Sequence, residues 1–309
     1  VLPRQRIIAE MRKIMDTILQ VENLTKQYPG FQLDHVSFSI PKGAIMGLIG
    51  ENGAGKSTTI HAILDLIKKD EGTVSFWGKN LSSDPCLKED IGVVFDDINF
   101  YETLDPQKVG AISKTAYKKW DNHLYQYYLD RFSLPVNKEI KTFSKGMKTK
   151  LCIAVALSHK PKLLILDEAT NGLDPVMRDD ILDVFLEFVQ EEDHSILISS
   201  HITTDLEKIA DYITFIHKGN VIFCKPKDEL RYSYGILRCK TEEYQKLDPA
   251  DIIACRKEDY QWSVLVADKE LARKKYKNAV IDNATIDDIL LLYVKGELKN
   301  EKLNPKRFI

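Results

Sequence analysis

Short, uninterrupted apolar runs alternate along this chain with segments in which apolar residues recur every three or four positions. Three such runs occupy residues 44–49, 163–166 and 196–198. Runs of this length without polar alternation are typical of strands that are buried on both faces of a parallel sheet. The segments after residues 57, 150 and 176 carry their apolar residues at helical spacing. The pattern therefore predicts an α/β fold whose helices pack on a mostly parallel core sheet.

Two other regions have patterns of their own. Between Pro106 and Pro135, aromatic and apolar residues recur mostly at spacings of three and four: Tyr117, Trp120, Leu124, Tyr127, Tyr128 and Phe132. This spacing predicts a helical subdomain, at about residues 100–160, with an aromatic inner face. Beyond Leu230, short strands are expected around residues 236–239, 252–255 and 262–266. A final helix should open with the capping pair Thr285 and Asp288 and stop at Gly296.

Residues 231–309 are accordingly expected to form a small α+β appendage to a domain that spans residues 15–230. The appendage contains no cluster of residues that looks catalytic. A packing or dimer-stabilising role is favoured over ligand sensing.

A glycine-rich loop follows the first buried run. Residues 50–58 read GENGAGKST, which matches the pattern G-x-x-x-x-G-K-[ST] in full. In this pattern the backbone N–H groups cradle phosphates, Lys56 places an ammonium on them, and Ser57 offers its hydroxyl to Mg²⁺. The order of strand, loop and helix disfavours an ordinary glycine turn, and the helix dipole adds to an anion site. The predicted ATP-binding residues are Gly50, Glu51, Asn52, Gly53, Ala54, Gly55, Lys56, Ser57 and Thr58.

The other two buried runs end in side chains that suit ATP hydrolysis. Asp167 and Glu168 follow the second run, and His201 follows the third. Asp167 fits a Mg²⁺ ligand, directly or through water, and Glu168 is placed to orient and deprotonate the water that attacks the γ-phosphate. A histidine at a strand end is often structural, but the neighbouring loop and carboxylates favour a catalytic role for His201 together with Lys56.

With these residues in place, the chain closely resembles the nucleotide-binding subunit of an ABC transporter over roughly residues 18–230. The resemblance matches Tyr28 to the A-loop aromatic that stacks on adenine, although the same ring could cap the strand expected to start at Gln32. It matches residues 143–147 to the signature segment and residues 171–174, which include Asp174, to the D-loop.

The resemblance also implies a partner for the nucleotide site. In such proteins two nucleotide domains pack head to tail, and the signature segment of one closes over the ATP of the other. Ser144, Lys145 and Gly146 form this segment here, with Ser144 and the Gly146 N–H implied to contact the γ-phosphate. ATP would join the two surfaces, and hydrolysis would separate them. Whether the second subunit is identical stays open.

Three positions depart from the family pattern. Asp96 stands where the Q-loop usually has glutamine, Lys145 replaces a signature glycine, and Met147 replaces a glutamine. A carboxylate at position 96 can still reach the metal but cannot donate a hydrogen bond. The motifs FDD and FSKGM together resemble a bacterial exporter-type subgroup whose membrane subunits are separate chains. A cytoplasmic helix of that subunit would dock near residues 96–102.

Composition narrows the remaining options. The chain has 309 residues, of which 44% are hydrophobic and 29% charged, and its formal net charge is −2. No apolar run approaches the roughly 18 residues of a membrane span, so a membrane part is expected on another polypeptide and this chain at the cytoplasmic face of the membrane. The lack of net basic charge argues against nucleic acid as a partner. Five cysteines without metal spacing, with Cys152 expected as a small buried hydrophobe, fit free thiols in a reducing cytosol. Residues 1–14 are expected to be an extension, and residues 299–309 a solvated tail.

These observations predict an ATPase that uses ATP and Mg²⁺ to drive an ABC-type transporter, with export favoured by the subgroup resemblance. Two alternatives stay open: a soluble ABC protein that acts on nucleic acid or ribosomes, and an ATP-binding regulator with little turnover. The intact Glu168 and His201 argue against the regulator. The transported substrate is not encoded in this chain, since selectivity in this architecture lies in the membrane subunit.

Overall fold

The computed structural model describes residues 17–96, 100–277 and 279–298. The predictions for residues 1–14 and for the tail from residue 299 lie outside the described residues. So do residues 97–99 of the expected docking edge for a membrane subunit.

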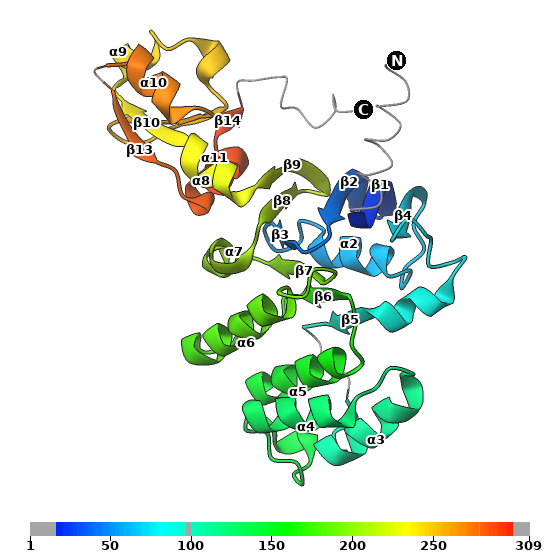
Figure 1. Cartoon of the computed structure of the whole chain (residues 1–309). Helices are drawn as coiled ribbons and strands as arrows, with labels where there is room; N and C mark the ends of the chain where they lie inside the picture. The colour runs from blue at the N-terminus through cyan, green and yellow to red at the C-terminus, as the bar shows by residue number, and fades with distance from the viewer. Residues whose placement is uncertain (1–16, 97–99, 278, 299–309) are drawn as a thin grey trace.

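A six-stranded sheet forms the centre of the molecule, in the order β5-β6-β7-β3-β8-β9 (Figure 1). Its strands are parallel except for β9, which runs antiparallel to β8. Their bounds are β3 Ile45–Ile49, β5 Ile91–Val94, β6 Leu163–Asp167, β7 Ser195–Ser200, β8 Tyr212–His217 and β9 Asn220–Pro226. The three apolar runs seen in the sequence became β3, β6 and β7, every residue of which is buried. Because these three strands are parallel neighbours, the residues that follow them meet at one edge of the sheet.

A second, antiparallel sheet in the order β2-β1-β4 lies beside the first. It consists of β1 Thr17–Tyr28, β2 Phe31–Pro41 and β4 Glu71–Phe76. The helix α2, Lys56–Ile63, shares one hydrophobic core with this sheet and with the central sheet. This helix starts directly after the glycine loop, so the core fixes the loop in place from behind.

The helical subdomain extends from the β5 side of the central sheet (Figure 1). It contains α3 Pro106–Ala116, α4 Asn122–Arg131 and α5 Lys145–Ser158, with the short helices η1 Pro85–Asp90 and η2 Ile140–Thr142 nearby. The aromatic stripe expected there is interrupted, because the backbone turns extended at Tyr117 and Tyr127 is exposed. The inner face is instead completed by Tyr125, whose hydroxyl donates to the carbonyl of Pro106. The helices α6 Pro175–Phe188 and α7 Thr203–Ile209 pack in the same apolar cluster as α5, against one face of the central sheet.

The last part of the chain forms a five-stranded antiparallel sheet in the order β13-β10-β12-β11-β14. Its elements are α8 Lys227–Ser233, β10 Gly235–Cys239, α9 Thr241–Tyr244, η3 Pro249–Asp251, β11 Ala254–Lys257, β12 Trp262–Val266, α10 Lys269–Lys275, β13 Val280–Asn283, α11 Ile286–Lys295 and β14 Glu297–Leu298. The α/β class with an α+β appendage, as the sequence predicted, is confirmed.

The helix α11 joins this appendage to the central sheet. Thr285 caps it by accepting from the Asp288 N–H, and the Asp288 carboxylate accepts from the Thr285 N–H in return, which is the capping box read from the sequence. Tyr293 packs on Phe215 of β8 and Phe223 of β9, with ring centroids 6.2 and 5.5 Å apart. One buried apolar cluster runs from the central sheet through α11, so the appendage and the central sheet share a core.

Candidate functional site

Two glycines of the loop between β3 and α2 lie where a side chain would clash with neighbouring groups. A Cβ on Gly50 would lie 2.3 Å from the carbonyl oxygen of Ile216, and one on Gly55 would lie 2.7 Å from a methyl group of Leu33. Gly55 also has φ +111°, in the region that side chains disfavour. The spacing of glycines seen in the sequence thus has a steric cause in the packing around the loop.

The start of α2 is open to an anion. Gly55 is the residue before the helix and has no side chain to cap it. The first N–H groups of a helix have no partner within it, and the helix dipole makes this end favourable for negative charge. Ser57, in the first turn, is exposed. The N–H groups of the first helical turn, which have no partner within the helix, therefore fit the predicted phosphate cradle.

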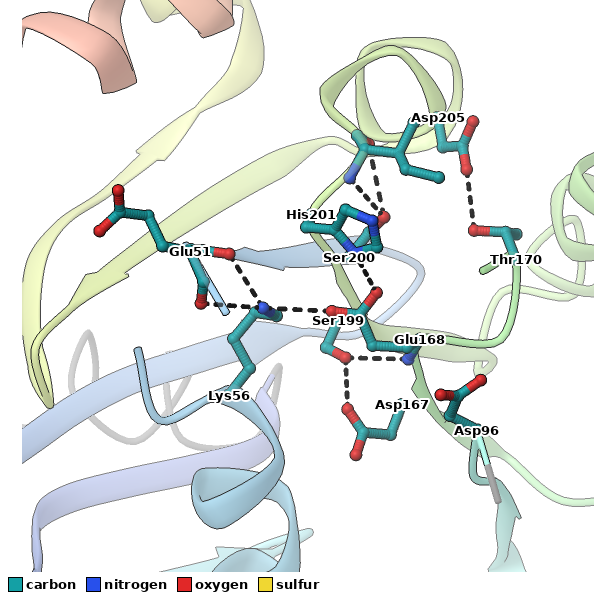
Figure 2. A network of polar contacts seen from close by, with 12 residues as sticks. Glu51, Lys56, Asp96, Asp167, Glu168, Thr170, Ser199, Ser200, His201 and Asp205 are labelled. Atoms are coloured by element: carbon teal, nitrogen blue, oxygen red, sulfur yellow. Dashed lines mark hydrogen bonds and ion pairs between the residues drawn. The ribbon is translucent and has the colours of Figure 1, made fainter. Parts of the chain in front are cut away.

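Lys56 is buried at the centre of this loop, with 5% of its side chain exposed. Its Nζ donates to the carbonyl oxygens of Gly50 at 2.9 Å and Glu51 at 3.3 Å, and it lies 3.1 Å from Oε1 of Glu168. Figure 2 shows the ammonium held between the loop and the carboxylate. The charge of the lysine is thus balanced by Glu168, at the place where the pattern puts a phosphate.

Glu168 connects the loop to the third strand. Its Oε2 lies 2.7 Å from Nδ1 of His201, so Lys56, Glu168 and His201 form one continuous chain of contacts (Figure 2). Glu168 has φ +52°, a left-handed conformation that is uncommon outside glycine. Strained backbone of this kind persists where the surroundings hold it and is frequent at functional sites.

Ser199 supplies part of that support and was not singled out from the sequence. Its hydroxyl donates to Oδ1 of Asp167 at 2.5 Å and accepts from the Glu168 N–H at 3.0 Å. One side chain of β7 thereby fixes both carboxylate residues at the end of β6. A serine at the end of an otherwise apolar run was the only available signal, and it does not specify these partners.

Asp205 is a second buried residue that the sequence analysis missed. It accepts a hydrogen bond of 2.8 Å from the Thr170 hydroxyl, and Arg178 Nε lies 3.8 Å away. Burial raises the pKa of this carboxyl, while the Thr170 hydrogen bond acts in the opposite direction. The contact ties the loop after Glu168 to α7, the helix that follows His201.

The residues matched to the A-loop and to the D-loop each have a local structural role. Tyr28 ends β1 opposite Phe31, with part of its ring exposed and Lys26 Nζ 5.5 Å from the ring centroid. Asp174 caps α6 by accepting from the N–H groups of Val176 and Met177. Adenine stacking by Tyr28 and a role for Asp174 toward a partner stay predictions.

The signature segment forms the start of α5. The Ser144 hydroxyl caps this helix by accepting from the Met147 N–H at 3.2 Å. Gly146 is buried against α6, where a Cβ would meet the Met177 sulfur at 2.6 Å. Lys145, between them, is exposed and lies 2.6 Å from Asp96. Two of the three positions that depart from the family pattern are therefore in contact.

Glu51 and Asn52, the remaining loop residues with long polar side chains, lie at its surface. The Glu51 carboxylate is directed away from Lys56, with Oε2 3.3 Å from Nδ1 of His217. Asn52 is exposed. Only the backbone carbonyl of Glu51 touches the lysine, so its carboxylate and that of Glu168 occupy opposite sides of the loop.

A family model described as "ABC transporter" matches residues 33–171. The lantibiotic transport ATP-binding protein SrtF of Streptococcus pyogenes is 36% identical over 219 residues, which cover 68% of this chain and 92% of SrtF. The chain belongs to the ABC transporter ATP-binding proteins. The bacitracin transport ATP-binding protein BcrA of Bacillus licheniformis is 34% identical over 221 residues, covering 70% of this chain and 72% of BcrA.

A solved structure titled as the ATP-binding subunit of an ABC transporter superposes with a TM-score of 0.64 and 30% identity, and it covers 70% of this chain and 92% of that one. These matches confirm the family that the sequence motifs indicated. This ABC transporter ATP-binding protein is an ATPase. Within the described ranges, none of its helices is both long and apolar enough to cross a membrane.

Proposed function

We propose that this protein is the motor subunit of an exporter, in which hydrolysis of ATP at the glycine loop drives a separate membrane-spanning subunit. The observation that carries the proposal is the continuous contact from Lys56 through Glu168 to His201. It joins a phosphate-binding cation, a candidate base and a candidate orienting group from three parallel strands in one site. Such an arrangement suits hydrolysis of the phosphoanhydride bond to the γ-phosphate better than binding alone.

The contacts indicate how a bound γ-phosphate activates Glu168 as the general base. The Lys56 ammonium pairs with one oxygen of Glu168, whose other oxygen faces His201. A γ-phosphate on the loop offers Lys56 a stronger partner, because it carries more negative charge than a carboxylate. Glu168 is then released to accept a proton from water, while His201 continues to orient it. In this mechanism the residue that binds the substrate also controls the base.

The donor set at the edge of the sheet fits Mg²⁺. Asp167 has one oxygen engaged by Ser199, and the exposed hydroxyl of Ser57 lies in the first turn of α2. Among the described residues, no group of three or more His, Cys, Asp or Glu side chains could hold a metal ion by itself. Mg²⁺ suits such a site, since it is usually bound by one or two carboxylates together with substrate phosphates. Ser57, Asp167 and, as a further candidate, Asp96 would hold it, and it would neutralise charge on the phosphates.

The proposed working unit is a dimer, homo- or heteromeric, in which Ser144 and Lys145 of one subunit face the ATP on the other. Both side chains are exposed at the start of α5, as such a contact requires. Val176, next to Asp174, is an apolar side chain that is 72% exposed. A partner surface over this region would remove it from water, which favours association. The Gly146 N–H lies in the first turn of α5, beside Ser144 and Lys145.

Export at the cytoplasmic face of a membrane is proposed from the relatives. The names of SrtF and BcrA assign lantibiotic transport and bacitracin transport to those proteins. The present chain matches each of them over more than two thirds of its length. We therefore propose a membrane subunit as partner and no nucleic acid. The cargo of this chain is a property of that subunit.

Two experiments test the proposal. Lys56→Ala should abolish ATP binding in calorimetry, because the loop keeps its N–H donors but loses its buried cation. Unchanged affinity would contradict the site. For the transport role, the reading frames that neighbour the gene are searched for one that encodes about six apolar spans, and its product is co-expressed with this chain and purified from membranes. A complex whose ATPase rate responds to the membrane subunit supports the motor role, whereas a chain that hydrolyses ATP but never associates with it refutes that role.

A further inference from the structure

Asp96 and Lys145 form an ion pair between the edge of the central sheet and the helical subdomain. Asp96 follows β5, and its Oδ1 lies 2.6 Å from Nζ of Lys145, the first residue of α5. Because β5 is the parallel neighbour of β6, Asp96 leaves the sheet at the same edge as Asp167. The pair thus connects the start of α5 to the edge of the sheet at which Asp167 and Glu168 lie.

The Lys145 side chain also lies beside the loop that follows Glu168. A Cβ placed on Gly172 would lie 3.7 Å from both Nζ and Cδ of Lys145. Gly172 has φ +72° and belongs to the loop that follows Glu168. The lysine side chain therefore pairs with Asp96 while lying near this loop.

The pair is too exposed to contribute much to the stability of the fold. Asp96 is 39% exposed and Lys145 47% exposed. Ion pairs with this exposure contribute little to stability, because water screens them and two flexible side chains must be ordered. A pair that contributes little is also separated easily when one member is offered a stronger partner.

Mg²⁺ is such a partner for Asp96. It carries two charges and prefers carboxylate oxygens as ligands. A bound divalent cation beside Asp167 would attract the Asp96 carboxylate and repel the Lys145 ammonium at the same time. The two cations therefore compete for one carboxylate.

We propose that Asp96 is shared between Lys145 and Mg²⁺, pairing with the lysine in the absence of nucleotide and turning to the metal when Mg²⁺ and ATP bind. Lys145 is then a positioning residue that holds the carboxylate off the metal site and is released on binding. Its release frees the start of α5, so metal binding is coupled to the helical subdomain. This inference rests on the proposed Mg²⁺–ATP site.

The test is a Mg²⁺ titration of nucleotide binding. Binding of a non-hydrolysable ATP analogue is followed by calorimetry over a series of Mg²⁺ concentrations for the full chain and its variants. Lys145→Gln should lower the Mg²⁺ concentration for half-maximal binding about two- to fivefold, which corresponds to the loss of an exposed ion pair. Asp96→Ala should raise it, and Asp96→Asn should raise it less. In the Asp96→Asn background, Lys145→Gln should have no further effect, because the contested carboxylate is gone.

Lys148→Gln is the matched control. Lys148 lies in the first turn of the same helix, but it faces Glu102 at 3.7 Å instead of the catalytic edge. This variant loses the same charge and should leave the Mg²⁺ dependence unchanged. Equal shifts for Lys145→Gln and Lys148→Gln would refute the competition, as would superimposable curves for Asp96→Asn and the parent chain. Loss of nucleotide binding at every Mg²⁺ concentration in the parent chain would instead contradict the proposed function.

Discussion

The ion pair between Lys56 and Glu168 makes ATP and the catalytic carboxylate competitors for one ammonium. Glu168→Gln removes the negative charge but keeps an oxygen that can accept from Lys56. Both side chains are largely buried, at 5% and 13% exposure, so the pair is poorly screened. Hydrogen bonds that involve a charged group contribute about 1.5–3 kcal/mol; the ion pair belongs at the upper end of this range, and the bond from the ammonium to a neutral amide at the lower end or below. The variant should therefore hold Lys56 more weakly by about 1–2 kcal/mol.

This difference predicts that Glu168→Gln binds ATP about 5- to 30-fold more tightly than the parent chain, since 1.4 kcal/mol corresponds to a factor of ten. Turnover should fall by about 10²- to 10⁴-fold, the usual contribution of a general base. Calorimetry with ATP measures the first effect and single-turnover hydrolysis measures the second. A variant that binds more tightly and turns over more slowly is what a released base requires.

Glu51→Gln is the control for charge. Glu51 lies in the same loop, but its carboxylate is directed toward His217 and only its backbone carbonyl meets Lys56. Removing this charge also reduces repulsion toward ATP, without freeing the lysine. Equal gains in affinity for the two variants would refute the competition for Lys56. Hydrolysis near the parent rate in Glu168→Gln would show that another group positions the water.

Two further predictions concern stability. Burial lowers the pKa of His159 to about 4, so the unfolded chain binds a proton below pH 6.5 that the folded chain does not. As the pH falls from 6.5 to 4, this residue should therefore lower the free energy of unfolding by roughly 3 kcal/mol. In urea unfolding, His159→Gln should lose less stability than the parent chain over that range. Parallel pH profiles for the two proteins would exclude this role. Tyr293 is 6% exposed in the core shared by α11 and the central sheet, so Tyr293→Ala should lower the free energy of unfolding of the whole chain by about 3–5 kcal/mol. Tyr260 is 94% exposed, so the control Tyr260→Ala should change it by less than about 0.5 kcal/mol. A separate early transition that leaves the ATPase part unaffected would show that the two parts do not share a core.

The central sheet and its loop could be predicted from the sequence because their signals are local. Strands buried on both faces leave continuous apolar runs, and the glycines are needed where a Cβ would meet Ile216 or Leu33. Parallel neighbours then bring Lys56, Glu168 and His201 to one edge. Each of these steps follows from the run of residues itself or from the geometry of a parallel sheet.

Contacts between side chains distant in sequence could not be predicted in the same way. Ser199 meets Asp167 across two strands, and Thr170 meets Asp205 across a loop and a helix. A serine or an aspartate has many possible partners, and only the folded backbone selects one. The prediction of a continuous aromatic stripe was wrong for a related reason, because helical spacing alone does not reveal the extended backbone at Tyr117.

The pair of Asp96 and Lys145 shows what the two kinds of information add to each other. The sequence identified both positions as departures from a family pattern and attached a metal role to one of them. In the structure, Lys145 Nζ lies 2.6 Å from Asp96 Oδ1, so the two positions form one ion pair. Its reading as a contested ligand depends on that distance and on the exposure of both side chains.

The most direct test of the account is steady-state release of phosphate from ATP and Mg²⁺ by the purified chain, with Lys56→Ala and Glu168→Gln measured beside it. The account predicts turnover in the parent chain, no turnover without ATP binding in Lys56→Ala, and ATP binding without turnover in Glu168→Gln. A parent chain that binds ATP but releases no phosphate, or a Glu168→Gln variant that releases it at the parent rate, would contradict a hydrolytic site built on Lys56, Glu168 and His201.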